Sequence, residues 1–247
     1  MPTAELLSPG FAAERACLIN PTHAATSPVP PGSPDGSYAG CPAAVGAGST
    51  VPAEGPNTTS LVTSDRWGNV VSYTLTIEQT GGSGIVVPGR GFLLNNELTD
   101  FNFAPTQGAA FDPNLPAPGK RPRSSISPTI VLRGGHPFLA TGSPGGATII
   151  TTVLQTLINR LDFGMSLPEA IAAPRASQRN GAAGGEAEPA FLALYGTALA
   201  AYGQKLLLNP EIGAAVGLEF LGHRRVLAAA EPVRRGGGSA LVVFPVR

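Results

Sequence analysis

The sequence predicts an α+β fold with strands and helices in αββα layers. Two observations support this prediction. β-Branched and aromatic residues gather in short runs joined by glycine turns, and one longer run repeats its apolar residues at helical spacing. The order of the runs, strand pairs first, then helices, then strands again, is typical of sheets that pack beneath helices. At 247 residues without an internal repeat, the chain is long enough to bury a core without disulfides.

The sequence of the first 57 residues predicts little regular secondary structure. Proline and glycine cluster at residues 28–37 and 52–56, which is typical of extended or disordered chain. Only residues 4–19 have a helical pattern. We therefore divide the chain into an irregular segment, residues 1–57, which looks like the tail of a larger unit or a propeptide, and a folded domain, residues 58–247.

The composition changes sharply at Thr58, where the predicted elements begin. β-Hairpins are predicted at residues 58–76 and 129–141, and short strands at 85–87 and 92–94. A proline-rich loop is expected at residues 105–123. Helices are predicted at residues 148–163, 167–173 and 189–202, and final strands at 205–208, 226–230 and 240–244. The first of these helices has an apolar stripe made of Ile149, Val153, Leu154, Leu157, Ile158 and Leu161.

Charge and composition exclude several functions. Sixteen basic and sixteen acidic residues give zero net charge, which argues against a protein built to hold nucleic acid. No apolar run reaches the 18 residues of a membrane span, and no signal peptide is visible. His23, His136 and His223 lack partners at ligand spacing, so we expect no metal, no cofactor and no Ser-His-Asp triad. Cys17 and Cys41 form either one disulfide or two inert thiols.

Two threonines, Thr58 and Thr59, follow Asn57 at the start of the first hairpin. On propensity alone they simply begin a strand. A chemical role would need the Thr58 hydroxyl to attack a substrate, and threonine is a weak nucleophile without a nearby base. An N-terminal threonine carries that base as its own α-amine, with a pKa of about 8. This interpretation requires cleavage before Thr58.

Three further motifs have both an ordinary and a functional interpretation. The glycine turn at residues 142–146 precedes the longest helix, so its amides could bind an oxyanion, although such turns are common in this chain. Ser124 and Ser125 lie in a polar turn that serves equally well as a helix cap or loop. Glu97 and Asp100 are three residues apart and could face one ammonium group, although a solvated loop is the default for such carboxylates.

Taken in order, these motifs resemble the small subunit of the γ-glutamyltranspeptidase family. The resemblance runs from about Asn57 to the Arg-Arg-Gly-Gly-Gly-Ser segment at residues 234–239. Its most specific strings are Leu-Leu-Asn-Asn at 93–96, Lys-Arg-Pro-Arg-Ser-Ser-Ile-Ser-Pro-Thr at 120–129 and Gly-Ser-Pro-Gly-Gly at 142–146. The resemblance implies an N-terminal-nucleophile hydrolase with an αββα sandwich, incomplete in this chain, made as a precursor that cleaves itself between Asn57 and Thr58.

The resemblance also implies a role for each matched residue. The family has Gln or Glu where this chain has Glu97, and bacterial members often have Asn where it has Glu78, which puts the usual donor contact in question. The implied roles are nucleophile for Thr58, support of the nucleophile for Thr76, oxyanion hole for Gly145 and Gly146, donor amino group for Glu97 and Asp100, donor carboxylate for Ser124 and Ser125, and donor contact for Glu78.

The expected function is γ-glutamyl transfer from a donor such as glutathione to water, an amino acid or a peptide. The family's large subunit would precede Thr58 by several hundred residues, so we expect a large-subunit-like half as the partner. Family members are often periplasmic or secreted, but this sequence does not indicate a compartment. Two alternatives remain: a cephalosporin (glutaryl) acylase of the same family, and an inactive fragment that binds a partner through exposed sheet edges.

Overall fold

The computed structural model describes residues 2–38, 40, 57–106, 112–222 and 225–243, and they form the predicted α+β fold. The helices are α1 (Thr3–Leu6), α2 (Pro9–Ala16), α3 (Ile149–Leu161), α4 (Leu167–Ala172) and α5 (Pro189–Ala201). The 3-10 turns are η1 (Glu97–Asp100), η2 (Gly146–Thr148) and η3 (Arg234–Gly236). The strands are β1 (Asn57–Ser64), β2 (Val70–Glu78), β3 (Thr129–Arg133), β4 (His136–Gly142), β5 (Ala176–Ser177), β6 (Gly185–Ala187), β7 (Leu206–Leu208), β8 (Val216–Gly222) and β9 (Arg225–Ala230).

The strands form three sheets. β1 and β2 make the first predicted hairpin, and the second hairpin, β3–β4, continues through β8 and β9 into a four-stranded antiparallel sheet. A small sheet, β5-β6-β7, contains one parallel pair. In the first hairpin Thr58 lies opposite Thr76, and the register shifts between Asn57 and Thr58. The chain therefore has an irregularity at the bond before Thr58.

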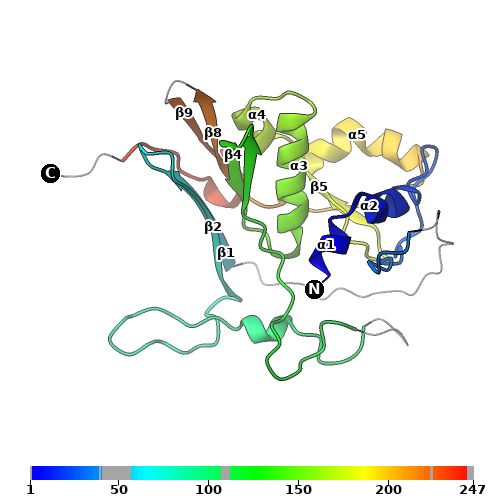
Figure 1. Cartoon of the computed structure of the whole chain (residues 1–247), viewed down its shortest axis with the longest axis horizontal. Coiled ribbons are helices and arrows are strands. Elements are labelled where there is room, and N and C mark those ends of the chain that lie inside the picture. The colour runs from blue at the N-terminus through cyan, green and yellow to red at the C-terminus, as the bar shows by residue number, and fades with distance from the viewer. Residues whose placement is uncertain (1, 39, 41–56, 107–111, 223–224, 244–247) are drawn as a thin grey trace.

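The β1–β2 hairpin and the helices lie on opposite faces of the four-stranded sheet (Figure 1). β1 packs against β8 and β2 packs against β4, while α3 and α4 cover the other face. The core between sheet and helices contains Phe138, Leu139, Leu167, Ile171, Ala215 and Ala229. No helix in the described part of the chain is both long and apolar enough to cross a membrane.

Local sequence signals determine where α4 and α5 begin. Ser166 and Glu169 form a capping box at the start of α4, in which each side chain accepts the other residue's backbone N–H. Pro189 occupies the first position of α5, where its missing N–H costs no hydrogen bond. Both helices begin and end within two residues of their predicted bounds.

Several predicted elements were wrong. Residues 85–87 and 92–94 make a single bridge, Val86 to Leu93, instead of two strands. Residues 240–243 form no strand, and Phe244 lies outside the described residues, as does Cys41, on which the disulfide question depends. The helix expected at 4–19 is divided into α1 and α2, because Pro9 starts a new helix capped by Ser8. The sequence analysis also missed β5, β6 and β8.

The predicted apolar stripe of α3 is only half correct. Ile149 and Val153 are buried, but Leu154, Ile158 and Leu161 are exposed. The helix instead buries Thr152, Thr156 and Asn159. The two threonine hydroxyls donate to the carbonyls of residues 148 and 152, so burying them leaves no unsatisfied donor.

A cluster of two arginines and two glutamates lies buried where α4, β9 and η3 meet. Arg175 and Glu231 are each 1% exposed and are joined by a 3.0 Å ion pair. Arg234 bonds Glu188 at 2.6 Å and Glu231 at 3.0 Å. Glu188 also accepts the backbone N–H groups of Arg175 and Ile212, both at 2.9 Å. Breaking such a pair leaves a buried charge uncompensated.

We predict that Glu188→Gln destabilises the protein by about 3 kcal/mol or more at pH 7. Burial raises the pKa of Glu188, but the hydrogen bonds from Arg234 and two backbone amides outweigh burial and lower it. Its stabilisation is therefore fully present above the unfolded-state pKa of about 4.3 and is lost as the pH falls through the lower folded-state value. The difference in unfolding free energy between the variant and the wild type, measured by urea unfolding, should therefore shrink as the pH is lowered.

The matched control is Glu186→Gln, two residues away. Glu186 pairs with Arg179 at 2.5 Å, but both side chains are more than a quarter exposed. Such a pair contributes about 0–1 kcal/mol. Equal losses of unfolding free energy in the two variants would contradict the importance of the buried cluster.

Candidate active site

The structure brings the predicted site residues together around one small cavity near the start of β1. The cavity measures about 20 Å³, room for about one water. Asn57 and Gly145 immediately precede two of the lining residues, Thr58 and Gly146. Its lining consists of Thr58, Thr76, Glu78, Glu97, Asp100, Ser124, Ser125 and Gly146, together with Ile126 and Ile149.

Two hydrogen bonds through Thr76 connect the Thr58 hydroxyl to the peptide carbonyl that precedes it, and a third bond holds Thr76 in place. Thr58 Oγ1 donates to Thr76 Oγ1 at 3.0 Å, and Thr76 Oγ1 donates to the Asn57 carbonyl oxygen at 3.0 Å. The Glu78 N–H donates to Thr76 Oγ1 at 2.8 Å. A hydroxyl has one proton and two lone pairs, so Thr76 is fully used. The protons of the hydroxyl chain Thr58–Thr76–Asn57 therefore all point toward the Asn57 carbonyl, and the Thr76 hydroxyl polarises this carbonyl next to Thr58.

Glu78 ends β2 in an unusual backbone conformation. Its φ is 71°, a region that side chains other than glycine seldom occupy and that is common at functional sites. The turn buries the side chain, whose carboxylate accepts the Asn96 amide at 2.7 Å. Thr99 donates to the same oxygen at 3.4 Å. Glu78 thus connects the hydroxyl chain, through its N–H, to the residues around η1.

The lining of the cavity includes three acidic residues and two serines. Glu97 and Asp100 come from η1, and Asp100 is buried. Ser124 and Ser125 come from the irregular segment before β3. Carboxylates bind an ammonium group through charge-assisted hydrogen bonds, and serine hydroxyls donate to a carboxylate. These side chains are of the kinds that bind an ammonium and a carboxylate close together, and a group carrying both needs more room than the single water that the cavity holds.

The glycine turn lies between β4 and α3. Gly145 has φ 145° and Gly146 has φ 55°. A Cβ on Gly145 would lie 2.8 Å from Thr148 Oγ1 and 3.2 Å from Gly213 Cα, so a larger residue would not fit without displacing its neighbours. Gly146 lines the cavity and begins the turn that leads into α3. Amides at a helix N-terminus stabilise negative charge.

Sequence reasoning missed the residues that support these groups. Asn96 donates to both Glu78 and Thr99, and its own side-chain oxygen accepts the Gln79 N–H. Asn102, Asp112 and Asn114 organise the loop that leads to Ser124. The available signal was the density of asparagine and aspartate in this stretch, because these side chains favour local bonds to the backbone. In the described ranges, no group of three histidine, cysteine or acidic residues could hold a metal ion.

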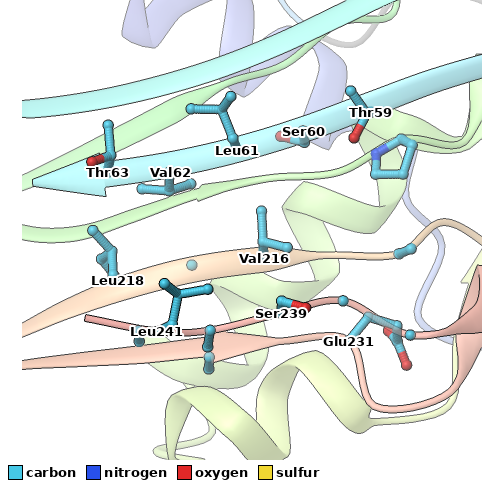
Figure 2. Close-up of a pocket in the computed structure, with 18 of the residues that line it drawn as sticks. Thr59, Ser60, Leu61, Val62, Thr63, Val216, Leu218, Glu231, Ser239 and Leu241 are labelled. Atoms are coloured by element: carbon cyan, nitrogen blue, oxygen red, sulfur yellow. The ribbon is translucent and has the colours of Figure 1, made fainter. Parts of the chain in front are cut away.

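A larger groove of about 610 Å³ lies beside β1, and Thr58 lines both this groove and the small cavity. Figure 2 shows residues Thr59 to Thr63 on one wall and Val216, Leu218 and Leu241 opposite them. Among the described strands, β1 pairs with β2 alone. The groove therefore runs along a strand edge whose backbone groups have no strand partner in the described part of the chain.

Comparison with known proteins gives one consistent family. The gamma-glutamyltranspeptidase family model matches residues 1–241. A glutathione hydrolase proenzyme from Pseudomonas sp. (strain A14) is 38% identical over 187 residues, covering 72% of this chain and 29% of that protein. The chain spans between 19% and 29% of the length of the glutathione hydrolase proenzymes from this strain and from Bacillus subtilis (strain 168).

Two solved structures resemble the chain in different ways. A mutant of Helicobacter pylori gamma-glutamyltranspeptidase is 37% identical with a TM-score of 0.65, and the match covers 70% of this chain and 98% of that one. Cephalosporin acylase from Bacillus halodurans is 27% identical with a TM-score of 0.74, and the match covers 98% of this chain and 40% of that one.

Proposed function

The chain belongs to the gamma-glutamyltranspeptidase family, and we propose that it is the nucleophile-bearing part of a γ-glutamyltransferase or glutathione hydrolase. The main observation behind this proposal is the hydroxyl chain Thr58–Thr76–Asn57, which lies beside a cavity lined with three carboxylates and two serines. The substrates proposed are a γ-glutamyl donor such as glutathione, and water, an amino acid or a peptide as the acceptor.

In the first proposed step the chain cleaves itself before Thr58. Thr58 Oγ1 attacks the Asn57 carbonyl carbon while the Thr76 hydroxyl donates to the carbonyl oxygen. The hydroxyl proton passes to the Thr58 nitrogen as the C–N bond breaks, which gives an ester. Water then hydrolyses the ester to an Asn57 carboxylate and a free Thr58 amine. The register shift at Asn57–Thr58 supports this step, because the bond is already displaced from regular strand geometry.

In the second proposed step the freed amine serves as the base for transfer. An α-amine with a pKa of about 8 can take the Thr58 hydroxyl proton near neutral pH. Thr58 Oγ1 then attacks the donor's γ-carbonyl, and the amides of Gly145 and Gly146 stabilise the oxyanion. The leaving amine takes the proton, and water or an amine acceptor releases the γ-glutamyl group from Thr58. Glu97 and Asp100 hold the donor ammonium, and Ser124 and Ser125 hold its carboxylate.

The alternative donor is a glutaryl amide, as in cephalosporin acylases. Its support is the match of the Bacillus halodurans enzyme to 98% of this chain. A glutaryl group lacks the α-ammonium, however, and would leave three carboxylates facing a methylene group. A methylene group forms none of the charge-assisted hydrogen bonds that an ammonium offers to these carboxylates, so the cavity favours a γ-glutamyl donor. The non-catalytic alternative, a fragment that only binds a partner, predicts no cleavage before Thr58.

We also propose that a large-subunit-like half completes the fold as an αββα sandwich. The proenzyme relatives are more than three times the length that this chain spans. The groove beside β1 offers an unpaired strand edge, and α3 exposes Leu154, Ile158 and Leu161. Exposed apolar surface and open strand edges are typical of protein interfaces.

We predict that Thr58→Ala leaves the chain uncleaved, whereas Thr59→Ala is cleaved normally. Thr58 supplies the attacking hydroxyl, and Thr59 is the adjacent threonine on the same strand. Thr76→Val should slow cleavage by about tenfold or more, because the carbonyl loses a hydrogen bond and the Glu78 N–H loses its acceptor. Intact-mass analysis of the purified variants measures each outcome. Normal cleavage of Thr58→Ala would exclude Thr58 as the nucleophile.

We predict that Asp100→Asn discriminates between donors. Losing a charge-assisted bond to the donor ammonium costs about 1.5–3 kcal/mol. The variant's kcat/KM should fall by about ten- to a hundredfold for a γ-glutamyl anilide and change little for a glutaryl anilide. Both rates are measured on the same preparation. Equal losses for the two donors would contradict the assignment of the ammonium site.

We predict that the 247-residue chain alone has little or no γ-glutamyl anilide turnover and that co-expression with a large-subunit-like half from a relative restores it. The half should cover the groove beside β1 and the apolar face of α3, and it should also raise the yield of soluble protein. Turnover of the chain alone at the rate of the pair would show that no partner is needed.

A further inference from the structure

A buried carboxylate, Asp112, organises the loop between η1 and the serines at 124 and 125. Asp112 Oδ2 accepts the Thr106 N–H at 2.9 Å, the Thr106 hydroxyl at 2.8 Å and the Asn102 amide at 2.9 Å. Its Oδ1 accepts the Asn114 N–H at 2.9 Å and the same Asn102 amide at 3.2 Å. Four donors thus converge on one side chain that is only 3% exposed.

The two asparagines extend this cluster to both sides of the candidate donor site. On one side, the Asn114 amide donates to the Asp100 carbonyl oxygen at 2.7 Å. On the other, Asn114 Oδ1 accepts the Arg123 N–H at 2.8 Å, and the Arg123 guanidinium donates to Asn102 Oδ1 at 2.9 Å. Asn102 also donates its backbone N–H to the Asn114 carbonyl at 3.0 Å. The cluster therefore bonds directly to Asp100 and to the residue immediately before Ser124.

The charge on Asp112 strengthens these bonds. Burial raises the pKa of this carboxyl, but the hydrogen bonds from Thr106, Asn102 and Asn114 outweigh burial and hold the pKa well below its usual range. The side chain is therefore ionised near neutral pH. Hydrogen bonds to an ionised acceptor are roughly twice as strong as bonds between neutral groups, so Asp112 holds Asn102, Thr106 and Asn114 strongly in this arrangement.

We propose that Asp112, Asn102, Asn114 and Arg123 form a positioning cluster that fixes the separation between Asp100 and Ser124–Ser125. This inference rests on the proposed function, in which Asp100 holds the donor ammonium and the serines hold its carboxylate. Those two donor groups share one carbon atom, so the side chains that bind them must keep a fixed spacing. A binding site needs its groups held within about 0.5 Å of their productive positions. A displacement of about 1 Å lowers catalytic efficiency by roughly a hundredfold.

The positioning cluster is separate from the residues proposed for self-cleavage. The hydroxyl chain Thr58–Thr76–Asn57 belongs to β1 and β2, and its hydrogen bonds share no residue with those of the cluster. Disturbing the cluster should therefore weaken donor binding and leave self-cleavage intact. A residue needed only for folding would affect both.

The test compares Asp112→Asn with Asp65→Asn in the chain assembled with its large-subunit-like half. Asparagine keeps the shape of aspartate but replaces one acceptor oxygen with a donor group, which would face other donors. Asp65 is a matched control, because its carboxylate also accepts several bonds, from Trp67 and Asn69, but it lies in the exposed β1–β2 turn.

We expect Asp112→Asn to raise the KM for a γ-glutamyl anilide at least tenfold, with kcat changed less than threefold and cleavage before Thr58 unchanged by intact mass. Asp65→Asn should leave all three unchanged. An unaltered KM in Asp112→Asn would overturn the proposal, and so would a parallel loss of kcat, donor affinity and self-cleavage, because that pattern indicates general misfolding.

Amide hydrogen exchange on the same proteins tests the coupling without catalysis. In Asp112→Asn, exchange of the backbone N–H groups of Arg123 and Asn102 should accelerate at least tenfold, although both donate to Asn114 and neither donates to Asp112. The backbone N–H groups of β1 and β2 should keep their wild-type rates. Acceleration limited to Thr106 and Asn114, which donate to Asp112 directly, would overturn the proposal. If the wild-type assembly turns over no γ-glutamyl donor, the proposed function fails, and the exchange rates still decide whether the cluster couples the two sides.

Discussion

The hydroxyl of Thr76 is the contact on which the candidate site depends. It accepts from Thr58 and from the Glu78 N–H, and it donates to the Asn57 carbonyl. Because a hydroxyl has a single proton, these partners fix its orientation completely. The same three bonds determine where the Thr58 hydroxyl points, which carbonyl is polarised and how β2 turns at its end. The antiparallel register that places Thr58 opposite Thr76 is thus a requirement of the proposed chemistry as well as of the hairpin.

The backbone at the end of β2 divides the site into two functional parts. Glu78 adopts φ 71°, an uncommon conformation for a residue other than glycine. Its N–H donates to Thr76 in the hydroxyl chain Thr58–Thr76–Asn57. Its carboxylate accepts from Asn96, on the side of the cavity where the γ-glutamyl donor is proposed to bind. The proposed nucleophile, Thr58, lies on the paired β1–β2 hairpin. The proposed binding side for the γ-glutamyl donor is built from loops, so side-chain hydrogen bonds must hold its shape. The positioning cluster around Asp112 fits this role.

The sequence predicted the local elements well where turn signals and strand propensity agreed, as in both hairpins, α4 and α5. It also predicted which residues gather at the cavity, because the family resemblance supplied their order along the chain. It could not predict β8, whose Glu219 interrupts the apolar pattern. That carboxylate is buried because it pairs with Arg160 on α3, a partner 59 residues away. The supporting asparagines were missed for a similar reason, since their roles depend on contacts that only the folded loop creates.

The failure of the helical pattern on α3 has a physical cause that also bears on the proposed partner. A Cβ on Gly213 would lie 2.5 Å from Thr152 Oγ1, so the chain approaches this side of the helix too closely for a leucine. Threonines that satisfy their hydroxyls within the helix fit there. Leu154, Ile158 and Leu161 face away and are exposed in the described chain, whereas Ile149 is buried. Periodicity identified apolar residues of the helix but not which of them the described chain buries, and the exposed ones fit the proposed contact with a large-subunit-like half.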